Sequence, residues 1–263
     1  MTTAPADWSA LLAALPGIGL EELDAEAALQ TRVDRKYIVE PATCAAVMAD
    51  LEGARALDMD GVRAFRYVST YYDTPELHSY TSAARRRPSR FKVRTREYLD
   101  TGARAIEVKL RSAKGETVKH RAWLGDDARV AGALAGEARA FVASFPAVAG
   151  TVDSLAPVLR TDYERSTLVT PDGRITIDRA VTGTTVDGEA VDFGDWLIVE
   201  TKAVLRAGAV DRALWARGVR PSRVSKYCTT LAALRPELPA NRWARTLRRH
   251  LPTLAPVASL AGN

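Results

Sequence analysis

A run of alternating charged and apolar residues constrains the fold of this chain more than any other feature. Residues 90–111 read RFKVRTREYLDTGARAIEVKLR and contain the turn-forming triplet Asp100-Thr101-Gly102. On both sides of this triplet, charged residues alternate with apolar or small ones. Successive side chains of a strand point to opposite faces. The segment therefore predicts a β-hairpin with one cation-rich face and one apolar face, the latter (Phe91, Val93) packed beneath covering helices. In a barrel with the cation-rich face turned inward, that face would hold a highly anionic ligand.

The overall composition is that of a globular protein with an anionic partner. The chain has 263 residues, of which 47% are hydrophobic and 26% charged, and its net charge is +5. Cys44 and Cys228 match no metal or redox spacing, so we expect buried free thiols. No apolar stretch reaches the length of a membrane span, and no signal-peptide pattern begins the chain. We therefore expect a cytoplasmic protein.

The remaining patterns predict an α+β fold built from antiparallel hairpins. Eight or nine strand candidates follow one another, with helices inserted between groups, which favours an antiparallel barrel with helices packed outside. The clearest strands are expected at 31–40, 54–72 (two strands), 90–111 (two strands), 116–123, 158–169, 174–179 and 196–203. Helices are expected at 41–51, 126–149, 209–217 and 222–234, and another begins at Thr74-Pro75.

Cations recur at alternating positions in most of the expected strands. They are Lys36, Arg94, Arg96, Lys109, Lys119, Arg165, Arg174 and Lys202. Arginine presents a planar fork of donors that matches phosphate oxygens, and lysine adds a compact charge. Glu107 and Glu200 each precede a lysine by two residues, in the pattern Glu-x-Lys. Such a pair of carboxylates could hold a hard divalent cation against phosphate oxygens.

Other chemistries find little support in the sequence. The three histidines are scattered without metal spacing, and the chain contains neither a glycine-rich phosphate loop nor a Gly-x-Ser-x-Gly elbow. Solvated strand faces would explain alternating charge in any one strand, but less well in six. Aromatic residues beside the basic strands leave single-stranded nucleic acid as an alternative ligand. They do not share the cationic face consistently, however, so no nucleic-acid partner is expected.

Taken together, these segments resemble the catalytic domain of the vacuolar transporter chaperone (VTC) polyphosphate polymerases, within the triphosphate tunnel metalloenzyme (CYTH-like) superfamily. The matching pieces occur in the family's order over residues 30–234 and include TRVDRKYIVE, RFKVRTREY, AIEVKLRSAKGETVKHR, YERSTLV, GRITIDRA, WLIVETKA and RVSKYCTTL. The resemblance implies an antiparallel barrel with a basic tunnel. It also implies transfer of the γ-phosphate of ATP to a growing inorganic polyphosphate chain, with Mn²⁺ or Mg²⁺ as cofactor.

The resemblance also assigns roles to individual residues. Catalytic contacts to the phosphates are implied for Lys36, Arg94, Arg96, Arg165 and Arg174. Further phosphate-binding roles fall to Lys109, Lys119, Lys202, Arg223 and Lys226. Glu200 matches the metal-binding glutamate, and Glu107 is a second metal candidate.

One departure bears on the reaction. The hydrolase branch of the superfamily begins with Glu-x-Glu-x-Lys, whereas this chain has Arg32, Asp34 and Lys36. A two-metal hydrolase site is therefore doubtful, although hydrolysis of triphosphate or polyphosphate on the same fold stays open as an alternative. Non-catalytic binding of polyphosphate is a further alternative.

The expected organisation has three parts. Residues 1–29 form an N-terminal helical segment, residues 30–235 the VTC-like catalytic domain, and residues 236–263 a basic C-terminal tail. A stand-alone catalytic domain of this kind could be recruited to a membrane by a membrane-protein partner.

Overall fold

A computed structural model of the protein describes residues 8–27, 32–112, 115, 117–125, 132–204 and 206–251. Part of the helix expected at 126–149 (126–131) and the end of the expected tail (252–263) lie outside the described residues. The chain divides into two compact units. Unit 1 comprises Met1–Phe65, Tyr163–Val181 and Phe193–Val224, and unit 2 comprises Arg66–Asp162, Thr182–Asp192 and Ser225–Asn263.

Unit 1 contains a mainly antiparallel sheet with strand order β2-β11-β9-β8. Its elements are α1 (Trp8–Ala13), β1 (Gly17–Ile18), α2 (Leu20–Ala27), β2 (Arg32–Val39), α3 (Pro41–Ala49), β3 (Arg55–Leu57), β11 (Leu197–Val204), α7 (Ala209–Ala216) and parts of the long strands β8 (Ala156–Thr170) and β9 (Gly173–Thr185). β3 pairs with β8, and β1 pairs with β3 in parallel.

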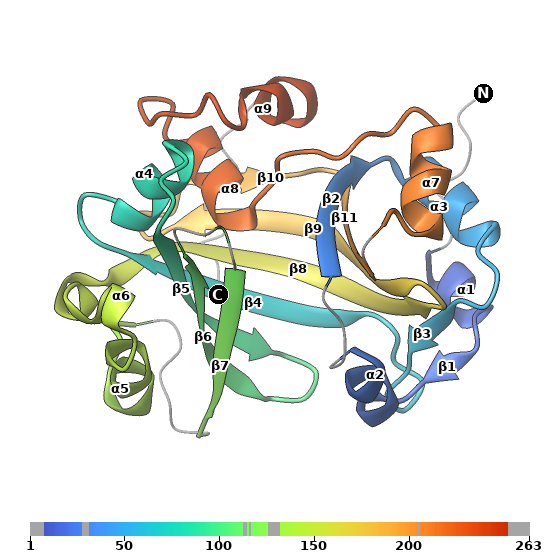
Figure 1. Cartoon of the computed structure of the whole chain (residues 1–263), viewed down its shortest axis with the longest axis horizontal. Helices are drawn as coiled ribbons and strands as arrows, with labels where there is room; N and C mark the ends of the chain where they lie inside the picture. The colour runs from blue at the N-terminus through green and yellow to red at the C-terminus, as the bar shows by residue number, and fades with distance from the viewer. Residues whose placement is uncertain are drawn as a thin grey trace. The chain divides into compact units, whose positions relative to one another are not determined.

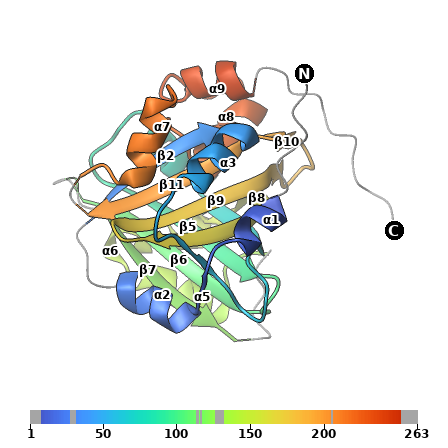
Figure 2. The same ribbon diagram turned by 90° about the vertical axis from the view of Figure 1, so that its right-hand side faces the viewer.

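One face of this sheet is apolar because alternate residues of each strand are large and hydrophobic. Tyr37 of β2 is paired with Val199 of β11, which is paired in turn with Ile177 of β9. All three are at most 1% exposed and share a core with residues of α1, α3 and α7. Figure 2 shows α3 and α7 together on one side of β2 and β11. The residues between these apolar positions therefore lie on the opposite face of the sheet.

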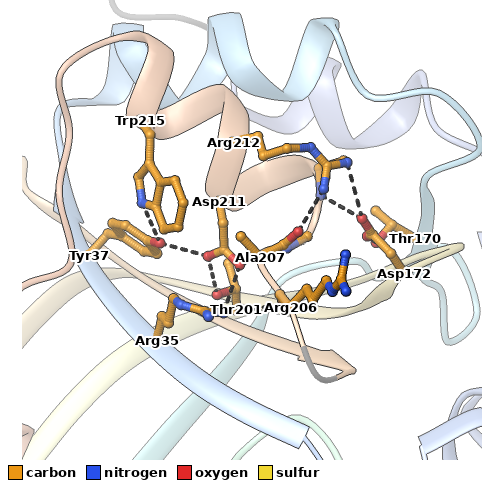
Figure 3. A network of polar contacts seen from close by, with 12 residues as sticks. Arg35, Tyr37, Thr170, Asp172, Thr201, Arg206, Ala207, Asp211, Arg212 and Trp215 are labelled. Carbon is orange, nitrogen blue, oxygen red and sulfur yellow. Dashed lines mark hydrogen bonds and ion pairs between the residues drawn. The ribbon is translucent and has the colours of Figure 1, made fainter.

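A buried carboxylate fixes α7 to this apolar face. Asp211 accepts hydrogen bonds from the Tyr37 and Thr201 hydroxyls, both at 2.7 Å, and forms an ion pair with Arg35 (Figure 3). Trp215 in turn donates its indole N–H to the Tyr37 hydroxyl at 3.0 Å. Burial beside Asp211 raises the pKa of Tyr37 far above its usual range, so the phenol stays protonated and donates. This network joins β2, β11 and α7 and has a structural role.

Unit 2 is built on strands β4 (Phe65–Asp73), β5 (Arg90–Tyr98), β6 (Arg104–Arg111) and β7 (Thr117–Leu124), hydrogen-bonded in this order. The short strand β10 (Ala190–Asp192) pairs with β9. The helices are α4 (His78–Ala84), α5 (Gly136–Ala143), α6 (Pro146–Ala149), a 3₁₀ turn (Val152–Ser154), α8 (Lys226–Leu234) and α9 (Ala244–His250).

The hairpin predicted at residues 90–111 is confirmed. β5 and β6 pair in register around a turn in which Gly102 has a φ of 70°, a conformation that glycine adopts readily. Phe91 and Val93 are at most 4% exposed and share a core with residues of α5 and α6. Figure 1 shows these two helices beside β6. The apolar face therefore packs beneath helices, as the alternation predicts.

The α+β class with antiparallel strands and packed helices is confirmed, although three helices differ from expectation, one of them α8, which begins at Lys226 and not at residue 222. The helix expected at 126–149 is, in the described part, two short helices, α5 and α6, because Pro146 begins a new helix. The helix expected to start at Thr74-Pro75 begins instead at His78. Asp73, which is fully buried, accepts backbone N–H groups of Thr74, Ser79 and Tyr80 and so replaces Thr74 as the main capping group.

Two further expectations concern the whole chain. Cys44 and Cys228 are buried free thiols, as predicted. Among the described residues, no helix combines the length and apolarity that a membrane crossing requires.

Candidate functional site

The face of unit 2 opposite the helices α5 and α6 carries a dense set of cations. The registers of β5, β6 and β7 place them in rows across the sheet. We call this set the cationic face: Arg90, Lys92, Arg94, Arg96, Lys109, Arg111, Lys119 and Arg121, with Glu107 as the one acidic residue of these three strands on it. Eight cations surround one carboxylate, so the face has a large excess of positive charge.

Glu107 lies at the centre of this face and is only 2% exposed. Its Oε2 accepts hydrogen bonds from Arg94 Nε, at 2.7 Å, and from Arg94 Nη2. Its Oε1 accepts from Lys119 Nζ at 3.2 Å and from Arg121 Nε at 3.0 Å. An ionised carboxylate offers about four lone-pair sites, and these four donors occupy them. Glu107 thus holds three cations of the face in fixed positions.

The pKa values of Glu107 and Lys119 are both lowered, but for different reasons. Burial alone would raise the pKa of Glu107, but the surrounding cations, Arg94 foremost, outweigh it and hold this pKa far below its usual range. Burial lowers the pKa of Lys119 to about 8, with Glu107 opposing the shift and Arg121 adding to it. Glu107 is therefore ionised at neutral pH and acts as the counter-ion of the cluster.

The two arginines predicted to grip phosphate are held by their surroundings. Arg94 lies over the ring of Tyr71, with its guanidinium carbon 5.9 Å from the ring centroid, and donates to the Tyr71 hydroxyl at 3.2 Å. Arg96 is 5% exposed and donates to the Ser69 hydroxyl at 3.2 Å. Neither arginine points freely into solvent, so the guanidinium groups are pre-oriented.

Helix α8 begins beside the cationic face and brings Lys226 with it. Lys92 Nζ donates to the hydroxyl of Ser225, the residue that caps α8, at 2.8 Å. Tyr227 donates its hydroxyl to Asp73 at 2.6 Å and stacks on Tyr71 with centroids 5.1 Å apart. Lys226, the first helical residue, lies between these two anchored residues. The predicted phosphate ligand Lys226 thus belongs to the same neighbourhood as Lys92.

Unit 1 holds a second cluster on the sheet face opposite α3 and α7. Glu200 of β11 is paired with Lys36 of β2, and the adjacent row places Lys202 between Asp34 and Arg174. We call Lys36, Glu200, Lys202 and Arg174 the Glu200 cluster. Glu200 Oε2 forms an ion pair with Lys36 Nζ, whereas Oε1 lies 3.9 Å from Lys202 Nζ, too far for a hydrogen bond. One oxygen of Glu200 is therefore less engaged than either oxygen of Glu107.

The Glu200 cluster also contains a lysine with a strongly perturbed pKa. Burial lowers the pKa of Lys202 to about 7, and Arg174 and Arg165 add to this shift against the opposing effect of Glu200. For Glu200, burial acts to raise the pKa, but the charges of Lys36 and Lys202 outweigh it and hold this pKa well below its usual range. Glu200 is therefore ionised at neutral pH, and the ammonium group of Lys202 loses its proton more readily than that of an ordinary lysine.

The other predicted residues of unit 1 have individual partners. Arg165 forms a two-pronged ion pair with buried Asp178, at 2.6 and 2.9 Å. Arg174 Nη1 lies 4.0 Å from Asp24. Arg223 is exposed and adjacent to Ser222, whose N–H donates to the Lys36 carbonyl at 2.7 Å. Arg223 is thus placed near the strand that carries Lys36.

The sequence reasoning missed three residues that the structure places in these clusters. Arg121 is bound to Glu107, Lys92 to Ser225, and Asp178 to Arg165. Arg121 could have been found from the sequence, because it stands two positions after Lys119 and so lies on the same face of the strand. Asp178 gave a weaker signal, because a single aspartate after RITI does not reveal its cross-strand partner.

No group of three or more His, Cys, Asp or Glu side chains capable of holding a metal occurs among the described residues. A divalent cation bound through one or two carboxylates plus substrate phosphates needs fewer protein ligands. Glu200, with one less engaged oxygen, fits that arrangement. Glu107 does not, because four cationic donors occupy its oxygens.

A family model described as the VTC domain matches residues 31–235. The chain therefore belongs to the VTC domain family, as the resemblance predicts. Membership supports a role in polyphosphate or triphosphate chemistry. No curated protein matches this chain.

Several solved structures are similar to this chain at low sequence identity. A candidate adenylate cyclase from Bacillus halodurans is 12% identical, with 74% of this chain and 94% of that chain covered and a TM-score of 0.47. The candidate adenylyl cyclase HpAC1 from Hippeastrum, for which a dominant triphosphatase activity is described, is 12% identical, with 80% and 99% covered and a TM-score of 0.47. The PH1819 protein from Pyrococcus horikoshii is 14% identical, with 73% and 91% covered and a TM-score of 0.41.

Proposed function

We propose that the protein is a metal-dependent polyphosphate polymerase that transfers the γ-phosphate of ATP to a growing inorganic polyphosphate chain. The observation that carries the proposal is the cationic face of unit 2, on which eight cations accompany a single carboxylate. Such a concentration of positive charge attracts a polyanionic ligand. Membership of the VTC domain family supports polyphosphate as that anion.

Phosphoryl transfer asks the protein mainly for positioning and charge neutralisation. Arg94 and Arg121 are fixed by Glu107, so they need little reorganisation when phosphate oxygens approach. Lys119, with 42% of its side chain exposed, can bond Glu107 and a ligand together. Glu107 is in this proposal a positioning residue that keeps three donors aimed at the phosphates.

Glu200 is the proposed ligand of a divalent cation, Mn²⁺ or Mg²⁺. The bound ion would neutralise charge on phosphate oxygens. Lys36 and Lys202 flank the carboxylate, so they hold Glu200 ionised whether or not the ion is present. Arg165, held by Asp178, and Arg174 are proposed further phosphate contacts.

The decisive test is incubation of the purified protein with ATP and Mn²⁺, followed by detection of long-chain polyphosphate. Growth of chains with release of ADP is the expected result. Release of inorganic phosphate without chain growth would instead identify a hydrolase. Tight binding of polyphosphate with no metal-dependent turnover would identify a binding protein, and either outcome would overturn the proposal.

The Arg94→Ala variant gives the matched test of the site. We expect it to abolish chain growth, because it removes two donors to Glu107 and a phosphate contact together. Arg66, which pairs with Asp100 at the protein surface, offers the control: Arg66→Ala removes an arginine of unit 2 outside the cationic face and should leave turnover unchanged.

A further inference from the structure

Trp123 is an aromatic side chain that the fold leaves in solvent. It is 59% exposed and is the one aromatic residue among the exposed large hydrophobic residues of the described part of the chain. Tryptophan usually buries most of its surface, so an exposed ring beside charged groups marks a candidate binding surface. Its strand, β7, places it on the same face as Lys119 and Arg121, because the three alternate along the strand.

Two tyrosines continue from Trp123 across the same face of the sheet, and one of them, Tyr98, contacts its ring. Tyr98 of β5 lies 5.6 Å from Trp123, and Tyr67 of β4 lies 5.0 Å from Tyr98, measured between ring centroids. Tyr67 and Tyr98 are direct partners in the sheet. We call these three residues the aromatic row. Neighbouring rings of the row are tilted by 60° and 51°, so the exposed ring of Trp123 is the surface on which a flat ligand would stack.

The aromatic row continues directly into the cationic face. The guanidinium carbon of Arg121 lies 5.1 Å from the Trp123 ring centroid, and Nε of the same arginine donates to Glu107. Arg96 lies 5.4 Å from the Tyr67 centroid. Residues two apart on a strand are separated by about 6.6 Å. A ligand that spans about this distance would therefore contact both the aromatic row and the cations around Glu107.

We propose that the aromatic row is a stacking site for the base of a nucleoside triphosphate whose phosphates lie on the cationic face. The proposal rests on the proposed function, which supplies ATP as the phosphoryl donor. The argument is one of complementarity: the surface is aromatic at one end and polycationic next to it, and a nucleotide has a base joined to phosphates. Stacking on aromatic side chains tolerates any base, so the site should accept guanine as well as adenine.

The row then gives the protein a way to distinguish its two substrates. ATP and inorganic polyphosphate share phosphate groups, so the cationic face alone binds both. The base exists only in the donor. A stacking site beside the cations therefore favours the nucleotide at this end of the face and leaves the remaining cations, towards Lys92 and Lys109, for bare phosphate chains.

The experiment compares the affinities of ATP and of inorganic tripolyphosphate for wild type and for Trp123→Ala, by isothermal titration calorimetry. We expect Trp123→Ala to weaken ATP binding about tenfold, equivalent to ~1.4 kcal/mol, and to change tripolyphosphate binding by less than twofold. Trp123→Phe should retain most of the ATP affinity. Val118→Ala is the matched control, because Val118 is 50% exposed on the other face of the same strand.

Two results would overturn the inference. Equal losses for ATP and tripolyphosphate would show that Trp123 acts only by holding Arg121. No loss for either ligand would show that Trp123 does not contribute to nucleotide binding. Circular dichroism of each variant identifies a folding defect, and Trp123→Phe then carries the comparison.

The inference and the proposed function can fail separately. If wild type makes polyphosphate but Trp123→Ala binds ATP normally, the stacking site is wrong and the polymerase stands. If wild type makes no polyphosphate while Trp123→Ala selectively loses ATP, the polymerase is wrong and the nucleotide site stands.

Discussion

The two glutamates of this protein occur in the same short pattern but in different surroundings. Glu107 precedes Lys109 on β6, and Glu200 precedes Lys202 on β11. Glu107 is bound by two arginines and a lysine, with both oxygens fully engaged. Glu200 pairs with Lys36 through one oxygen and leaves the other 3.9 Å from the nearest lysine nitrogen. The exposure of the two lysines also differs, and the more fully bound glutamate is followed by the more exposed lysine. Lys109 is exposed, whereas only 15% of the Lys202 side chain is exposed.

The difference comes from the strands on either side and not from the pattern itself. β6 lies between β5 and β7, both of which place an arginine beside Glu107. β11 lies between β2 and β9, which place Lys36 and Thr176 beside Glu200. Cross-strand neighbours therefore make Glu107 a fully engaged counter-ion and leave one oxygen of Glu200 less engaged, the oxygen that we propose binds a metal ion.

The largest expected effect is on stability, from Glu107→Gln. Neutralising a buried carboxylate leaves three cations without their counter-ion, and breaking a buried ion pair in this way costs about 3–5 kcal/mol. We expect the free energy of unfolding, measured by chemical denaturation at neutral pH, to fall by that amount. Glu97→Gln is the control, because Glu97 is half-buried on the other face of β5 and should change stability little. A drop of less than about 1 kcal/mol in Glu107→Gln would refute the counter-ion role.

The next effect is on turnover, from Glu200→Gln. We expect the fold to remain intact and metal-dependent chain growth to fall by about 10²–10³, the scale of losing one group that stabilises developing charge. The measurement is the initial rate of polyphosphate formation over a range of Mn²⁺ concentrations. Lost activity that excess metal partly restores would support Glu200 as the ligand. Wild-type activity in Glu200→Gln would exclude that role.

The sequence predicted the individual strands better than the partnerships between them. The alternation in residues 90–111 predicted the hairpin, its turn and its apolar face, because period-two patterns follow directly from strand geometry. It could not show that Glu107 would meet Arg121, because that depends on the register between β6 and β7. For the same reason the Glu-x-Lys pattern alone does not distinguish Glu107 from Glu200, and only the family resemblance made Glu200 the main metal candidate. The capping role of Asp73 was also missed, since its donors come from residues up to seven positions away and from Tyr227.

A moderate effect is expected from pH, through Lys202. Burial lowers the pKa of Lys202 to about 7, so the ammonium form is lost as pH rises through that value. Only the ammonium form attracts phosphate. If a bound polyanion requires it, affinity for tripolyphosphate should fall about tenfold between about pH 6 and pH 8.

The variant Lys202→Arg separates this effect from titration of the ligand itself. Arginine stays charged across this pH range, so the affinity of the variant should lose the pH dependence that comes from Lys202. The pH dependence that comes from titration of tripolyphosphate itself should remain in both proteins. Calorimetric titrations of both proteins at each pH provide the comparison. Parallel profiles for wild type and Lys202→Arg would show that Lys202 is not the titrating group.

The smallest effect on ligand affinity is expected from Lys109→Met, which tests the exposed lysine of the two Glu-x-Lys patterns. Lys109 lies on the cationic face but in solvent, where a single charge is screened and contributes about 0.2–1 kcal/mol. We expect polyphosphate affinity to fall two- to fivefold at low salt and the difference to shrink in high salt. Lys202→Met, measured in parallel below pH 7, should lose more affinity and keep more of that loss in salt, because its environment is drier. If the two variants lose equal affinity with equal salt dependence, burial does not distinguish the two lysines. The two Glu-x-Lys sites would then differ only in their glutamates.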